Sequence, residues 1–317
     1  MPHEVSDEAI ERLVVALDSL IDGDRAAEQL ISLGQSVVPY VERFLVASRP
    51  RSISISRCRA VRILGALGAY SSLIRYFREF VRPSDAAVLF AEDAVRSAAA
   101  RELMHHESPS TFRVLLDAAK HRPTSGIIQA LSQYRWPEIV PLLFELLEDD
   151  LCREDAKQGL RTVPEAAKAF AILLLRGLTN LPIHGANASR RKRATLQLLV
   201  EFGINMNEWP DLRQFLSDED RDCVIAAATL GLQCAPAAER PSIITALIEA
   251  SPGMNWAQET EAVELLDKWP ALARQAMREM QVQREMRGET PNWLSPFWRI
   301  LHHVLGSEMH PQRRGAA

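Results

Sequence analysis

The sequence predicts an all-α protein in which short helix pairs stack on one another. The first observation is a repeat, because AAEQLISLG at 26–34 returns as AVRILGALG at 60–68, 34 residues later. The second is that SVVPYVERFL at 36–45 returns as EIVPLLFELL at 138–147, at three times the same period. Repetition at a fixed period of this length is the signature of a repeat architecture. The third is that helical periodicity runs through the chain without competing strand-type alternation or hairpin turns.

The first repeat shows why each unit is expected to contain two helices. Its first half places apolar residues on one helical stripe and ends at Gly34, which suits a helix C-cap. Its second half opens with Ser36 as an N-cap and carries Pro39 in the first turn, where a missing N–H is harmless. The second stripe consists of Val38, Val41 and Leu45. A single helix pair cannot bury its apolar stripes alone, so neighbouring pairs must stack on one another.

The same pattern predicts the remaining elements in order. A leader helix is expected from about Ser6 to Ile21, and a terminal helix from about Trp293 to Leu305. Between them lie about eight pairs, at 24–34/36–47, 56–69/71–82, 84–106/109–121, 125–135/137–149, 152–162/164–178, 189–204/208–217, 219–233/237–250 and 256–268/270–287. We expect a single domain over 1–317, with a leader at 1–23, repeats at 24–287, and a cap helix with a flexible tail at 288–317.

The repeats resemble HEAT repeats. The first-helix pattern A-x-x-x-L-x-x-L-G is met at Ala26–Gly34 and Ala60–Gly68, and the second-helix pattern V-P-x-(L/V)-x-x-x-L at Val38–Leu45 and Val140–Leu147. The units are short and are most similar to bacterial HEAT-like and phycobilisome-lyase-type repeats. This resemblance implies a curved α-solenoid over about 20–285, with the second helices lining the concave side. The third and the fifth to eighth units depart strongly from the pattern.

Composition predicts a folded, water-soluble protein in a reducing compartment. The formal charge is −4, with 47% hydrophobic and 25% charged residues, which argues against a protein that coats nucleic acid. The four cysteines, Cys58, Cys152, Cys223 and Cys234, form no C-x-x-C pair or metal-ligand spacing. The N-terminal segment reads as an amphipathic helix, and the longest apolar run, 169–175, is far shorter than the ~20 residues that span a bilayer. We expect a cytoplasmic protein without a membrane partner.

Basic charge is concentrated at 49–82, which holds eight arginines against Glu79 alone. One interpretation is pairing with neighbouring units or solvated helix faces, since 1–48 is strongly acidic. The other is a binding site for an acidic protein partner. In that case Arg75, Arg78 and Arg82, spaced i, i+3 and i+7, form a row on the concave side, where only Glu79 is expected nearby. Further candidate residues in the band are Arg57 and Arg59. The basic run 190–193 and the acidic segment 201–222 pose the same alternatives.

A tryptophan–proline dipeptide occurs three times, at Trp136, Trp209 and Trp269, each at the turn inside a helix pair. The first interpretation is structural, with proline at the first helical position and tryptophan packing as a hydrophobic staple. The second is an aromatic row on one edge of the stack that binds a partner.

Motifs that carry catalytic chemistry are absent from the sequence. No P-loop, dinucleotide fingerprint, nucleophile elbow or H-E-x-x-H occurs. Glu102 and His105 form a lone E-x-x-H, and Asp218, Asp220 and Asp222 lack the glycine and distal glutamate of a calcium loop. We therefore expect a protein that is not an enzyme and needs no metal or cofactor.

The favoured function is a protein-binding scaffold acting as an adaptor, an inhibitor or an immunity-type binder. Two alternatives come from the resemblance. Phycobilisome-lyase-type repeats imply a bilin lyase-like chromophore chaperone, although no cysteine or histidine is placed to handle a tetrapyrrole. HEAT-like alkylpurine DNA glycosylases imply nucleic-acid binding, but no basic stripe runs the length of this chain. The oligomeric state is left open.

Overall fold

The computed structural model describes residues 6–47, 53–182, 188–290, 292 and 294–306. Over these residues the chain is helical and contains no strand, which confirms the all-α prediction. The chain forms two compact units, Met1–Val163 and Pro164–Ala317. The predicted tail after Gly306 and two arginines of the basic band, Arg49 and Arg51, lie outside the described residues. In the part described, no helix combines the length and apolar composition needed to cross a membrane.

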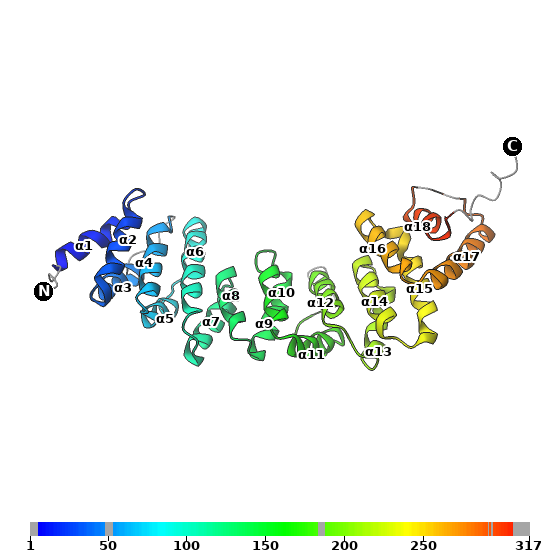
Figure 1. The fold of residues 1–317 in the computed structure, drawn as a ribbon, viewed down its shortest axis with the longest axis horizontal. Helices are drawn as coiled ribbons and strands as arrows, with labels where there is room; N and C mark the ends of the chain where they lie inside the picture. Colours follow the sequence, from blue (N-terminus) through cyan, green and yellow to red (C-terminus); the bar gives the residue numbers. More distant parts are fainter. Residues whose placement is uncertain (1–5, 48–52, 183–187, 291, 293, 307–317) are drawn as a thin grey trace. The chain divides into compact units, whose positions relative to one another are not determined.

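Unit 1 repeats one packing arrangement along the chain. The first helices of successive pairs pack on one another in the order α2, α4, α6, α8, α10, and Figure 1 shows them side by side. Among the second helices, α3 packs on α5 and α5 on α7. The helices are α1 (Asp7–Ala16), α2 (Gly23–Leu33), α3 (Val38–Ala47), α4 (Ile55–Ala66), α5 (Tyr70–Arg78), α6 (Ala86–Leu103), α7 (Pro109–His121), α8 (Ser125–Gln133), α9 (Val140–Glu145) and α10 (Arg153–Arg161).

Unit 2 follows the same rule. Its successive first helices α12, α14, α16 and α18 pack in order, and the second helix α15 packs on α17. The helices are α11 (Pro164–Leu175), α12 (Ala188–Phe202), α13 (Trp209–Leu212), α14 (Arg221–Cys234), α15 (Arg240–Ala250), α16 (Trp256–Asp267), α17 (Pro270–Met286) and α18 (Pro296–Leu305). Most of the predicted pairs therefore exist as helix pairs, with ends shifted by a few residues.

The repeated stripes form the core. Leu30 on α2, Leu45 on α3 and Leu64 on α4 are fully buried, as their spacing predicts. The first helices also approach closely: a Cβ at Gly126 of α8 would lie 2.3 Å from the backbone oxygen of Ser97 on α6. Only glycine fits there, so the backbones of α6 and α8 pack without an intervening side chain.

Gly68 ends α4 as the repeat predicts. It has a φ of 66°, a conformation that glycine adopts without steric cost. Its N–H donates to the Gly65 carbonyl at 2.9 Å, and the N–H of Ala69 donates to the Leu64 carbonyl at 2.8 Å. These two bonds are the Schellman pattern, which satisfies carbonyls left open at a helix end.

Two local predictions in the first repeat were wrong. Ser36 is not an N-cap, because it lies inside a 3-10 helix, Gly34–Val37, and its hydroxyl donates to the Leu33 carbonyl at 3.3 Å. Val37 rather than Val38 is therefore fully buried at the start of the stripe, whereas Val41 and Leu45 are fully buried as predicted.

Helices α1 and α5 end several residues before their predicted ends. The leader helix ends at Ala16 instead of Ile21, and the Ser19 hydroxyl accepts a hydrogen bond from the Asp22 N–H at 3.0 Å in the turn that follows. Helix α5 ends at Arg78 instead of Arg82, consistent with Pro83, which disfavours helical backbone in the residue before it.

Candidate anion-binding pocket

Two arginines of the basic band are structural. Arg57 is 6% exposed, lies 3.0 Å from the Glu92 carboxylate and donates to the Leu45 carbonyl at 2.7 Å. Arg59 is 5% exposed and donates to the Asp24 carboxylate from two nitrogens at 3.0 Å. Arg57 and Arg59 were predicted to bind a partner, and the structure corrects this prediction. Both guanidinium groups are buried and contact residues of neighbouring helix pairs.

Arg75 is exposed, but it is already paired. Its guanidinium lies 2.8 Å from Glu42 of α3 and 2.7 Å from Glu79. The hydrogen bonds that Arg75 donates to Glu79 and, with a smaller effect, to Glu42 raise the pKa of Arg75 above its ordinary value. The expectation that only Glu79 lies nearby was wrong, because packing of α3 on α5 brings Glu42 across.

The predicted arginine row does not exist as one helical face. Arg78 is the last residue of α5, whereas Arg82 lies in the non-helical segment after it. Val81, in the same segment, is 80% exposed. Arg78 and Arg82 nevertheless line the same pocket.

This pocket, of about 660 Å³, lies among α5, the segment that follows it, α6 and α7. Five arginines and a single aspartate line it. One face of α7 contributes half of the lining residues at helical spacing. The lining residues are Phe77, Arg78, Phe80, Arg82, Arg96, Ser110, Arg113, Val114, Asp117, Ala118, His121 and Arg122.

Arg96 builds the base of the pocket. It is 1% exposed and donates to the carbonyls of Ala118 and Arg122, at 3.0 and 2.9 Å, at the C-terminal end of α7. Its guanidinium carbon also lies 4.6 Å from the centre of the Phe80 ring, a cation–π contact. Burial lowers the pKa of Arg96 from its ordinary value. Its Nε is buried without a hydrogen-bond partner.

Arg122 is also committed to the fold. Its Nε donates to the Asp93 carboxylate of α6 at 2.7 Å, and its Nη2 donates to the second oxygen at 2.5 Å. This hydrogen bonding raises the pKa of Arg122. A bidentate pair of this kind fixes both groups in position.

The positive charges of three pocket arginines are not compensated by acidic side chains. Arg78, Arg82 and Arg113 are exposed, and none of them forms an ion pair or hydrogen bond with another described residue. They stand beside the apolar walls formed by Phe77, Phe80 and Val114. The pocket therefore offers positive charge next to an apolar surface, which suits an anion with an apolar part.

Sequence reasoning found two of these residues and missed the others. Arg96, Arg113 and Arg122 lie outside the basic band, on α6, on α7 and directly after α7, respectively. The sequence signal for Arg113 is the i, i+4, i+8 spacing of Arg113, Asp117 and His121, which places three polar side chains on one face of a helix.

The tryptophan–proline residues serve packing rather than one exposed row. Trp209 is 1% exposed, and its indole N–H donates to Glu239 at 2.8 Å. Trp136 is half-buried and lies 4.5 Å from the ring centre of Phe112. The ring of half-buried Trp269 lies 4.8 Å from the guanidinium carbon of Arg240. Burial removes Trp209 from any partner-binding surface, which corrects the predicted set.

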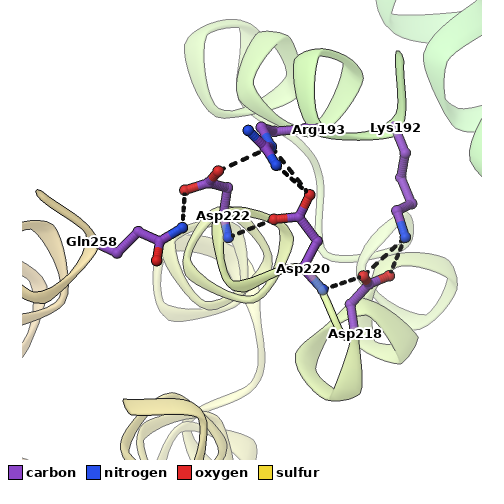
Figure 2. Close-up of polar contacts among 6 residues, drawn as sticks. All are labelled: Lys192, Arg193, Asp218, Asp220, Asp222 and Gln258. Atoms are coloured by element: carbon purple, nitrogen blue, oxygen red, sulfur yellow. Dashed lines mark hydrogen bonds and ion pairs between the residues drawn. The ribbon is translucent and has the colours of Figure 1, made fainter. Parts of the chain in front are cut away.

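In unit 2 the basic run pairs with the acidic segment. Figure 2 shows Lys192 of α12 beside Asp218. The Lys192 ammonium group lies 2.7 Å from the Asp218 carboxylate. Arg193 lies 2.7 Å from Asp220 and 2.9 Å from Asp222. Asp222 also accepts a hydrogen bond from Gln258 of α16 at 2.8 Å. These contacts link three successive first helices, so the charges at Lys192 and Arg193 stabilise the stack.

The described residues include no group of three or more His, Cys, Asp and Glu side chains able to hold a metal ion. Comparison of the chain with family models, curated proteins and solved structures finds no match.

Proposed function

We propose that the chain is a HEAT-like α-solenoid that binds an acidic segment of a protein partner and performs no catalysis. The observation that carries this proposal is the pocket in which Arg78, Arg82 and Arg113 stand without a partner. The solenoid is supported by the successive packing of first helices within each unit. The proposal covers an adaptor, an inhibitor or an immunity-type binder, because each of them captures a protein.

Electrostatics favours an acidic occupant for this pocket. Guanidinium groups bind carboxylates through paired hydrogen bonds, and like-charged groups in one pocket repel each other until an anion compensates them. The pocket volume of about 660 Å³ lies within the range of ordinary ligand sites. An acidic segment would therefore gain both affinity and association rate there.

The test is isothermal titration calorimetry with an unlabelled acidic peptide of about 11 residues, at about 50 and 300 mM NaCl. We expect binding that weakens as salt rises, since exposed charge pairs are screened. A serine–glycine peptide of equal length is the control and should not bind. Absence of binding, or an affinity that does not change with salt, would contradict the proposal.

The same pocket supports a bilin chaperone as a second candidate. A tetrapyrrole combines carboxylates with a flat apolar ring system, and the pocket combines arginines with Phe77 and Phe80. Titration with a bilin followed by absorbance tests this candidate. A red shift that is lost in an Arg113→Glu variant would favour it over the acidic segment.

Nucleic-acid binding gains no such support. Lys192 and Arg193 are paired with aspartates, and buried Arg191 donates to the Pro182 carbonyl at 2.8 Å.

We place the protein in the cytoplasm, a proposal supported by its four free cysteines.

A further inference from the structure

We infer that the pocket selects an acidic segment containing an aromatic side chain, which inserts between the apolar walls while flanking carboxylates meet the arginines. This inference rests on the proposed function and specifies the partner sequence that the pocket takes. It concerns the apolar part of the lining, which charge complementarity leaves unexplained.

Apolar side chains reach the pocket lining from two different parts of the chain, which we call its two walls. Phe77 and Phe80 come from the end of α5 and the segment after it, and Val114 and Ala118 come from α7. Phe80, Val114 and Ala118 each keep part of their surface exposed to solvent. Burial of this surface by an apolar group is favourable, whereas a purely acidic segment would leave the apolar surface in contact with water.

The aromatic wall is held in place. The buried guanidinium of Arg96 lies against Phe80 and is fixed by two carbonyls of α7. Because the base is fixed, Phe80 offers a preformed surface, and a preformed site loses less entropy when its ligand binds. Phenylalanine, tyrosine and tryptophan are the side chains that bury the most apolar area in such a pocket.

Positive charge stands on both walls. Arg78 and Arg82 belong to the α5 side, and Arg113 belongs to α7. A segment that inserts one aromatic side chain between these walls therefore meets an arginine on either side. Acidic residues before and after the aromatic residue fit this arrangement, with a central anchor and a charged rim.

The experiment compares two peptides of equal charge by calorimetry, one with phenylalanine at the centre of an Asp/Glu sequence and one with alanine there. Both peptides are unlabelled, because many dyes are themselves aromatic anions. We expect the phenylalanine peptide to bind about tenfold more tightly, as for a buried aromatic anchor.

A wall variant locates the anchor. Val114→Trp fills the space between the walls, so it should abolish the advantage of the phenylalanine peptide over the alanine peptide. Val15→Trp is the matched control, because Val15 is 71% exposed on α1 and does not line the pocket. Ala118→Leu is the second filling variant if Val114→Trp lowers the melting temperature.

The outcomes separate this inference from the proposed function. Equal binding of the two peptides would overturn the aromatic anchor while the acidic-segment proposal stands. Binding of neither peptide would overturn both. A preference for phenylalanine that survives both filling variants would place the anchor elsewhere and overturn the inference.

Discussion

Arg59 of α4 bonds to Asp24 of the first repeat and also holds two backbone carbonyls of the leader segment. Besides the Asp24 carboxylate, its Nη1 donates to the carbonyls of Leu17 and Ser19, each at 2.8 Å. These two carbonyls belong to the turn that ends the leader helix. One buried side chain therefore fixes both the position of α2 and the path of the chain before it.

Replacing Arg59 should destabilise unit 1. Arg59→Met keeps the apolar stem but leaves the Leu17 carbonyl without a donor, for which we expect a loss of about 1–3 kcal/mol in the free energy of unfolding. Arg62→Met is the control, because Arg62 is half exposed and lies 3.6 Å from the same carboxylate. Urea unfolding followed by circular dichroism measures both, and equal effects would contradict a special role for Arg59.

The same contact predicts a dependence on acid. The hydrogen bond from Arg59 lowers the pKa of Asp24 below 3.8, so this contact stabilises the fold above about pH 4 and is lost as the pH falls further. In Arg59→Met the stability should fall less between neutral pH and pH 3. The measurement is the free energy of unfolding of the parent protein and of Arg59→Met as a function of pH. An equal decrease in both proteins between neutral pH and pH 3 would contradict this prediction.

Gly68→Val should be destabilising because it places a β-branched residue at positive φ. We expect a loss of about 1–3 kcal/mol, as for other strained backbone positions. Gly68→Asn is the matched variant, since asparagine tolerates this conformation better. The melting temperature should fall more for valine than for asparagine, and the reverse order would show that the Schellman turn is not formed.

Trp209 should be required for the stability of unit 2. Trp209→Ala removes a fully buried indole and leaves Glu239 without its donor, which we expect to cost about 3–5 kcal/mol. Trp256→Ala is the matched control, because Trp256 is 79% exposed at the start of α16 and should change stability by less than about 0.5 kcal/mol. Similar melting temperatures for the two variants would contradict the staple interpretation.

The buried cysteines should resist alkylation. Burial raises the pKa of Cys152 to about 11 and that of Cys223 to about 12, so both are thiols at pH 8. Mass spectrometry after iodoacetamide treatment should find Cys58 and Cys234, which are only partly buried, labelled first. Labelling of Cys223 in the native protein as fast as in the unfolded protein would contradict this.

The sequence predicted the helices well because repeated apolar stripes report burial directly. Leu30, Leu45 and Leu64 lie where their spacing puts them. Helix ends were less predictable, since they depend on local backbone chemistry such as the proline that follows Arg82. The partners of charged residues were the least predictable. Glu42 reaches Arg75 from 33 residues away, and only the packing of α3 on α5 brings them together.

The candidate site was predicted only in part for the same reason. Arg78 and Arg82 stood out in the basic band, but the band also contains Arg57 and Arg59, which are buried. Composition alone does not separate a buried, paired arginine from an exposed, unpaired one. Arg113 completes the pocket from the next helix pair, about 30 residues further along.

Binding of an acidic segment in the pocket is tested most directly by calorimetry of the acidic peptide with a triple variant, Arg78→Glu, Arg82→Glu and Arg113→Glu. The control is an equally charged variant, Arg12→Glu, Arg25→Glu and Arg43→Glu, whose exposed arginines lie on α1–α3 outside the pocket. Both should keep the helical signal and melting temperature of the parent. We predict that the pocket variant loses binding while the control keeps most of it, apart from a weak long-range effect that salt removes. Unchanged binding by the folded pocket variant, or equal loss in both variants, would show that the pocket does not bind the acidic segment.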